Sequence, residues 1–249
     1  MRFRLISCEI FAREMCDAVV RSPHRVDIEF LPNGLHDIGA EGMLARLQEA
    51  VDRCEGAAYD AILLGYGLCN NGIVGLFSRS HQVVVPRAHD CITLFFGSRE
   101  RYLEYFHSRP GTYFMTSGWL ERGRDAGELT QLSIQHRMGM DLSYEELVAR
   151  YGEDNAAYLR ETLCDTLRNY GRLTYIHMGI EPDDRFERES RALAAERGWT
   201  FEAVDGDMGL IRRMLAGRWD EADFLVVPPG WQVRAAHDGA ILRAEPATP

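Results

Sequence analysis

Residues 59–76, with the sequence YDAILLGYGLCNNGIVGL, determine how the chain is expected to fold. Residues 61–64 form an unbroken apolar run, which is typical of a strand buried on both faces of a parallel sheet. Two glycines follow, and glycine allows a sharp turn because it has no Cβ atom. Cys69 lies at this turn, and residues 70–72 are expected to begin a helix. The stretch therefore predicts a thiol at the end of a strand and the start of a helix.

The composition is that of an ordinary soluble globular protein. The chain has 249 residues, of which 46% are hydrophobic and 27% are charged. The net charge of −10 argues against nucleic-acid binding, which needs a basic surface. No apolar run is long enough to cross a membrane, and the N-terminal residues are expected to enter a strand rather than to form a signal peptide. We therefore expect a cytoplasmic protein with six reduced cysteines.

Lysine is absent from the sequence, so all 28 cationic side chains are arginine. A Schiff-base lysine, a pyridoxal phosphate anchor and a P-loop lysine each need a primary amine, which arginine does not supply. These three classes of chemistry are excluded.

Strands alternate with helices along the chain, which predicts an α/β fold with mostly parallel sheets. Five expected strands precede a helical region and three follow it: residues 3–7, 25–31, 61–64, 82–86 and 112–115, then 173–177, 200–204 and 222–227. The pattern favours two Rossmann-like lobes, residues 1–118 and 119–249, with a cleft at the carboxyl ends of both sheets. A capping box at Ser143 and Glu146 opens a long helix within an inserted helical segment, and Gly152 is a potential break in that helix.

Three cysteines each follow an expected strand. Cys8, Cys69 and Cys91 come after the first, third and fourth strands, which are neighbours in the common doubly wound order. Helix dipoles would lower the pKa of such thiols, and three thiolates could share one metal ion or cluster with a position left open. Soft thiolates favour zinc, copper(I) or an iron–sulfur cluster. The alternative is that these cysteines are only packed as small hydrophobic residues, as is expected for Cys16, Cys54 and Cys164.

Other polar residues at expected strand ends are candidates for the same site. His89 and Asp90 precede Cys91 and could act as acid and base, although a solvated pair on a capped loop is the alternative. The remaining candidates are expected to bind a ligand through backbone amides, a guanidinium group or carboxylates. They are Asn70, Asn71, Gly72, Arg99, Asp205 and Asp207, where Arg99 could instead be solvated and Asp207 could only cap a helix.

Several of these stretches together resemble the domain of unknown function family 1638. The resemblance rests on the strand end at Cys8 and on the motifs GYGLCNNG (65–72), HDCITL (89–94), GSR (97–99), YFMTSGW (113–119) and FLVVPPG (224–230). It implies relatives in bacteria and archaea, some of them encoded beside corrinoid methyl-transfer systems. It transfers no role to any residue.

Three functions follow as hypotheses. The first is a metal-dependent enzyme, with zinc or a [4Fe–4S] cluster on the three thiolates, that acts on a small anionic substrate in the cleft between the lobes. The second is an accessory protein that carries a metal or a corrinoid-related ligand and catalyses nothing. The third is a protein that binds an anionic metabolite through helix N-termini and arginines, with the cysteines merely packed.

Overall fold

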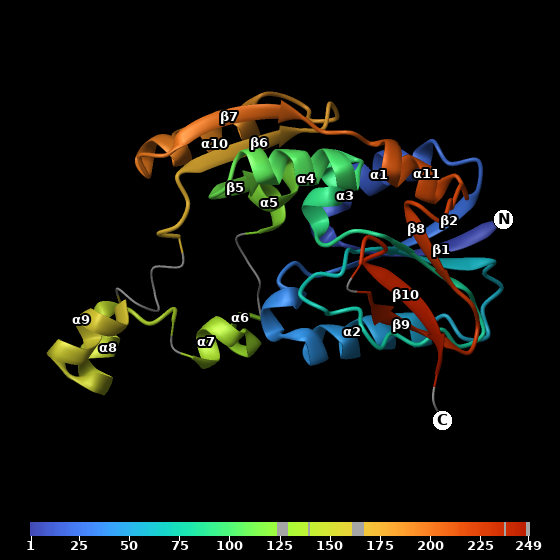
Figure 1. Ribbon diagram of the computed structural model, residues 1–249, viewed down its shortest axis with the longest axis horizontal. Coiled ribbons are helices and arrows are strands. Elements are labelled where there is room, and N and C mark those ends of the chain that lie inside the picture. The colour runs from blue at the N-terminus through green and yellow to red at the C-terminus, as the bar shows by residue number, and fades with distance from the viewer. Residues whose placement is uncertain (124–128, 139, 161–166, 237, 248–249) are drawn as a thin grey trace.

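The computed structural model describes residues 1–123, 129–138, 140–160, 167–236 and 238–247 (Figure 1). It is an α/β fold with two separate, mostly parallel sheets and a small antiparallel hairpin. The α/β architecture with Rossmann-like lobes that the sequence predicts is therefore confirmed.

The larger sheet is parallel except for its last strand. Its spatial order is β2 (Arg25–Leu31), β1 (Arg2–Cys8), β3 (Ala61–Gly65), β4 (Val83–Pro86) and β8 (Phe224–Val227), with β8 antiparallel to β4. Every residue of β3 and β4 is buried, as expected for central strands that helices or loops cover on both faces. The neighbours β1, β3 and β4 run in the same direction, so their carboxyl ends meet at one edge of the sheet.

The smaller sheet contains three parallel strands, β5 (Thr112–Met115), β6 (Arg172–His177) and β7 (Thr200–Asp205). Its own apolar cluster includes Leu173, Tyr175 and Phe186. The helix α4 (Arg99–Ser108) packs on this sheet, where the hydroxyl groups of Tyr105 and Thr174 are hydrogen-bonded at 2.6 Å.

Two remaining strands, β9 (Trp231–Ala235) and β10 (Leu242–Pro246), form the antiparallel hairpin. The other helices in the described parts range from single turns to α2, which has 13 residues. The 3-10 helices are η1 (Glu9–Phe11) and η2 (Leu35–Ile38), and the α-helices are α1 (Ala12–Val20), α2 (Ala40–Asp52), α3 (Cys91–Phe96), α5 (Ser117–Arg122), α6 (Leu129–Leu132), α7 (Ile134–Arg137), α8 (Tyr144–Tyr151), α9 (Glu153–Leu159), α10 (Arg185–Glu196) and α11 (Gly209–Leu215).

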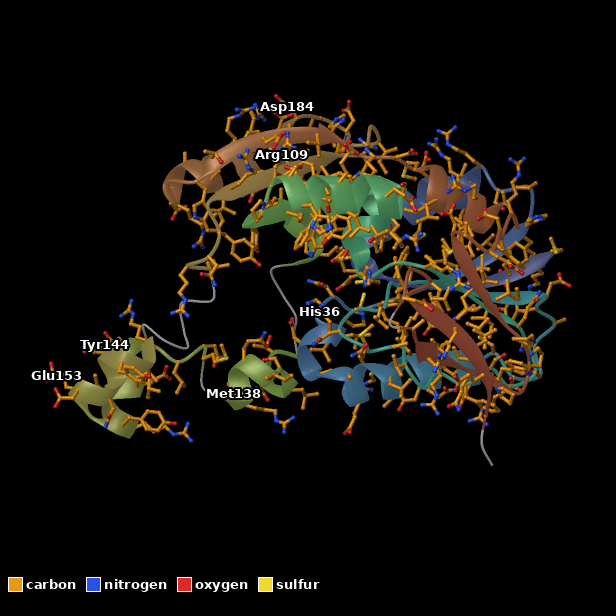
Figure 2. All side chains as sticks on the ribbon, viewed as in Figure 1. His36, Arg109, Met138, Tyr144, Glu153 and Asp184 are labelled. Carbon is orange, nitrogen blue, oxygen red and sulfur yellow. The ribbon has the colours of Figure 1, made fainter. Side chains whose placement is uncertain are left out.

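The helical insert lies between the parallel neighbours β5 and β6. Figure 1 shows α8 and α9 as a pair at one end of the molecule, away from both sheets, and Figure 2 labels Tyr144 and Glu153 on this pair. The capping box of Ser143 and Glu146 is present, and Gly152, with a φ of 80°, separates α8 from α9. Helical spacing predicts that Tyr151 and Tyr158 lie on the buried side of this helix, but they are 42% and 66% exposed. Among the described elements, α8 and α9 contact mainly each other.

The division of strands between the sheets differs from the expected boundary at residues 118 and 119. The strand β5 belongs to the smaller sheet, whereas β8 joins the larger sheet from the other half of the chain. Each sheet is thus built from segments on both sides of the expected boundary.

No helix in the described ranges combines the length and the apolar character that crossing a lipid bilayer requires.

Candidate active site

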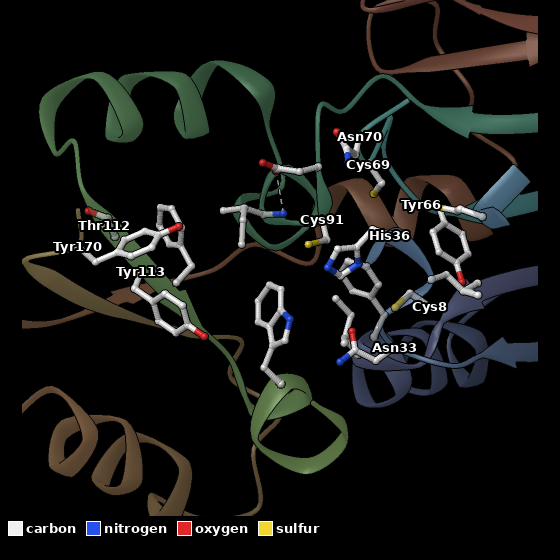
Figure 3. Close-up of a pocket in the computed structure, with 18 residues that line it drawn as sticks. Cys8, Asn33, His36, Tyr66, Cys69, Asn70, Cys91, Thr112, Tyr113 and Tyr170 are labelled. Carbon is white, nitrogen blue, oxygen red and sulfur yellow. Dashed lines mark hydrogen bonds between the residues drawn. The ribbon is translucent and has the colours of Figure 1, made fainter. Parts of the chain in front are cut away.

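A pocket of about 370 Å³ lies at the carboxyl ends of β1, β3 and β4 (Figure 3). Its lining combines thiols and amides at one end with aromatic rings at the other. The residues are Cys8, Ile10, Phe11, Asn33, Leu35, His36, Met43, Tyr66, Cys69, Asn70, Asp90, Cys91, Ile92, Thr112, Tyr113, Phe114, Trp119 and Tyr170. The volume is within the range typical of small-molecule sites.

The three predicted cysteines all line this pocket. Cys8 is the last residue of β1, Cys69 lies in the loop after β3, and Cys91 is the first residue of α3, after β4. Figure 3 shows their three side chains directed toward one space. The neighbouring order of β1, β3 and β4, from which this convergence was predicted, is confirmed.

Two glycines allow the loops that carry Cys69 and Cys91 to lie against their neighbours. A Cβ atom on Gly67 would meet the carbonyl oxygen of Ala88 and backbone atoms of Asp90 at 3.0 Å. A Cβ atom on Gly65 would meet the Ser7 hydroxyl oxygen at 2.3 Å. Both glycines are therefore needed for close approach rather than for the sharp turn expected from the sequence.

The loop after β3 is not the start of a helix. Residues 70–75 form turns, and three successive residues have left-handed backbones, with φ values of 43° at Cys69, 60° at Asn70 and 64° at Asn71. Asparagine tolerates this conformation, but a non-glycine residue in it costs about 1–3 kcal/mol. Such strain at a pocket wall is typical of functional loops.

The pKa values of the three thiols are raised, which corrects the expectation of lowered values. Burial raises the pKa of Cys8 and of Cys69 to about 12, even though nearby backbone amides act in the opposite direction. Burial also raises the pKa of Cys91 well above its ordinary value, and Cys69 and Cys8 raise it further. The helix dipole expected to act on Cys69 is missing because no helix begins there, and desolvation dominates at all three.

The three sulfur atoms do not already form a closed metal site. Within the described ranges, no group of three or more His, Cys, Asp or Glu side chains is arranged so that it could hold a metal ion. Binding of one ion by Cys8, Cys69 and Cys91 would thus need the loops to move closer together.

Asp90 lines the pocket but has a clear structural role. One of its carboxylate oxygens accepts hydrogen bonds from the backbone amides of Ile92 at 3.0 Å and Thr93 at 3.3 Å, so it caps α3. Its other oxygen accepts a hydrogen bond from the Tyr102 hydroxyl at 2.9 Å. Burial raises the pKa of Asp90, while these donors lower it in part. His89 is exposed and lies outside the pocket lining.

Of the predicted ligand-binding residues, only Asn70 lines the pocket. Gly72 packs against Met43, and Asn71 is exposed. Arg99 donates a hydrogen bond to the carbonyl oxygen of Gly239 and pairs with Glu100. Asp207 accepts a hydrogen bond from the backbone amide of Gly209 at the start of α11, as expected from the alternative that it caps a helix. Asp205 is exposed at the end of β7.

Sequence reasoning missed Asn33 and His36. They follow β2, which lies beside β1, so the strand-end rule applied to the cysteines would also have found this segment. The Glu9 carboxylate accepts a hydrogen bond from the Asn33 backbone amide at 2.6 Å, which ties the loop to the residue after Cys8. His36 is half exposed, with its Nε2 atom 3.2 Å from a carboxylate oxygen of Asp37.

Tyr66 was also missed. It is 3% exposed, and its hydroxyl group has no hydrogen-bond partner in the described part of the chain. Burial raises the pKa of Tyr66 well above its ordinary value, with smaller contributions from Cys8 and Cys69, so the hydroxyl group keeps its proton. A buried hydroxyl group without a partner costs about 1–3 kcal/mol, and a ligand in the pocket could supply the partner.

Comparison with curated proteins and with solved structures gives no match. One family profile does match, and it covers residues 30–215. The matched range includes the loops after β2, β3 and β4, both ends of the helical insert and all three strands of the smaller sheet. Because the match spans most of the 249 residues, the chain belongs to the family described as protein of unknown function (DUF1638).

Proposed function

We propose that the protein is a metal-dependent enzyme in which the thiolates of Cys8, Cys69 and Cys91 hold zinc or a [4Fe–4S] cluster. A small molecule would occupy the rest of the pocket and reach the open position on the metal. The observation that carries this proposal is the presence of three cysteines, from three adjacent strand ends, in one pocket lining. A reducing cytoplasm would keep the thiols free to bind the metal.

The surroundings of the three cysteines suit a metal with soft ligands. Desolvation raises the pKa of each thiol so that all three keep their protons, and thiolates that share one pocket would repel one another. A cation removes this repulsion, and its binding displaces the thiol protons. The loops that carry Cys69 and Cys91 are joined by backbone hydrogen bonds and would move together toward Cys8 to complete the site.

His36 is the residue at the pocket best suited to acid–base chemistry. It is the one histidine in the lining, it is open to solvent, and Asp37 lies within 3.2 Å to orient its ring. His89 and Asp90 are less suited, because the first lies outside the lining and the second is occupied by the cap of α3.

Anaerobic purification followed by metal analysis and a visible spectrum tests the proposal. A brown protein with iron and sulfide would indicate the cluster, and a colourless protein with one zinc per chain would indicate the zinc site. A reduced protein that stays metal-free after reconstitution with zinc, and with iron and sulfide, would rule the proposal out.

The second candidate is a non-catalytic protein that carries a metal or a corrinoid-related ligand. The observation in its favour is that Asp90, the one carboxylate in the lining, is held by three hydrogen bonds and is not free to transfer protons. If the protein holds a stoichiometric metal but converts no bound small molecule into a product, the non-catalytic carrier is favoured.

A further inference from the structure

We infer that the aromatic end of the pocket binds a methylated ammonium group, so that the ligand is a small organic cation rather than an anion. The inference rests on the proposed function only in taking this pocket as the substrate site. It concerns the end of the pocket opposite the thiols, where Figure 3 shows Thr112, Tyr113 and Tyr170.

Four partly exposed aromatic side chains line this end. Tyr113 and Phe114 come from β5, Trp119 from α5, and Tyr170 from the segment before β6. The rings of Tyr113 and Tyr170 have centroids 5.3 Å apart and an interplanar angle of 84°, so they form a corner. Aromatic faces attract cations within about 6 Å, and several faces around one site form the cage that binds quaternary ammonium groups.

Residues outside the pocket lining hold these aromatic rings in place. Trp119 packs against Phe95, with ring centroids 5.3 Å apart, and Tyr113 packs against Trp199 at 5.8 Å. The helix α5 lies very close to η1: a Cβ atom on Gly118 would be only 1.7 Å from the carbonyl oxygen of Ile10. A preformed aromatic site loses little conformational freedom when a ligand binds.

The charges around the pocket disfavour an anion. No arginine is among the lining residues, all of which lie in the described ranges, and His36 is the one basic side chain there. The predicted clamp residue Arg99 is engaged with Gly239 and Glu100 instead. The chain as a whole carries a net charge of −10, which attracts cations over a distance.

The hydrogen-bonding groups at the aromatic end favour a methylated ammonium group over a primary one. A primary ammonium group has three N–H donors, and each needs an acceptor once it is buried. The one carboxylate in the lining, Asp90, already accepts hydrogen bonds from two backbone amides and from Tyr102, so a primary ammonium group would have mainly neutral hydroxyl oxygens, such as that of Thr112, as partners. Methyl groups need none and pack directly on the rings.

The test compares three probes of nearly the same shape by calorimetry on the reduced protein in EDTA. Choline is the cation, 3,3-dimethylbutan-1-ol is its neutral analogue, and 3,3-dimethylbutanoate is an anion of similar size. We expect choline to bind about tenfold more tightly than the neutral analogue, and the anion to bind most weakly. Equal binding of choline and the neutral analogue, tighter binding of the anion, or no binding of choline would overturn the inference.

Variants of Tyr170 test whether choline binds at the aromatic end of the pocket. Tyr170→Leu is expected to weaken choline binding about fivefold or more, whereas Tyr170→Phe keeps the ring and should stay within about twofold of the wild type. Circular dichroism checks that both variants fold, and the comparison of probes on the wild-type protein needs no variant. Metal analysis and the same titration on Cys8→Ser separate the two proposals, because unchanged metal content with retained choline binding would contradict only the metal centre.

Discussion

The backbone amide of Cys69 donates a hydrogen bond to the carbonyl oxygen of His89 at 2.9 Å. This bond, with the adjacent one from Leu68 to Ala88 at 2.7 Å, joins the loop after β3 to the loop after β4. Two of the three thiols are therefore positioned by one shared piece of backbone. His89 contributes to the site through its carbonyl oxygen rather than through its imidazole ring.

The contact between these two loops predicts the effect of Gly67→Ala. The added Cβ atom would lie 3.0 Å from backbone atoms of Ala88 and Asp90, which move less easily than a flexible side chain. We expect a loss of about 1–3 kcal/mol in the free energy of unfolding, measured by urea denaturation. Gly171→Ala is the matched control, because nothing lies within 4 Å of its Cβ position, and it should change stability by less than about 1 kcal/mol. Equal effects of the two substitutions would show that the loops are not in close contact.

The unpaired hydroxyl group of Tyr66 predicts opposite effects on stability and binding. Tyr66→Phe removes a buried group that has no partner in the described residues, so the ligand-free protein should become more stable by about 1 kcal/mol. The same change should weaken metal or ligand binding if the hydroxyl group completes the occupied site. Tyr102→Phe is the control, because its hydroxyl group donates to Asp90, and it should lower stability. Unchanged stability and binding in Tyr66→Phe would contradict a role for the hydroxyl group.

The burial of Glu14, which is not part of the pocket lining, predicts that the stability of the protein depends on pH. It is fully buried on α1, both carboxylate oxygens lack a partner in the described ranges, and burial raises its pKa from 4.5 to about 7. The folded protein therefore binds a proton more tightly than the unfolded chain does. This stabilisation is complete below pH 4.5 and is lost as the pH rises to about 7, by up to about 3 kcal/mol.

The substitution Glu14→Gln isolates this effect. The variant should lack the pH-dependent loss and should be more stable than the wild type at pH 8. Denaturation at a series of pH values measures the difference, with the exposed Glu49→Gln on α2 as the control. Parallel stability curves for the wild type and Glu14→Gln would contradict the buried, protonated state.

The order of the central strands was predictable, whereas the membership of the two edge strands was not. Strands β1, β3 and β4 alternate with helices or turns, and that local pattern fixes their order and their shared edge. The apolar strand β8 could fit either sheet by composition. It joins β4 in antiparallel orientation through contacts between residues far apart in the sequence, such as Val84 and Val226. Local periodicity carries no information on such pairings.

The thiol end of the candidate site was predictable for the same reason, whereas most of the lining was not. The cysteines were identified because each follows an apolar strand, which is a local signal. Trp119 and Tyr170 stand at the two ends of a long helical insert and line the same pocket because β5 and β6 are neighbours. The left-handed backbone at Cys69 and Asn70 was not predicted, since these positions are not glycine and the motif resembled the start of a helix.

The most direct test of the central claim is the metal content of matched cysteine variants purified without oxygen. Cys69→Ser removes one of the proposed ligands. Cys54→Ser alters a buried cysteine that lies outside the pocket lining and whose thiol donates to the carbonyl oxygen of Ala50. Cys164 lies outside the described residues and is left unchanged. We predict that the wild type and Cys54→Ser carry the same stoichiometric zinc or iron, and that Cys69→Ser loses most of it. Equal metal content in all three proteins would contradict the proposed thiolate centre.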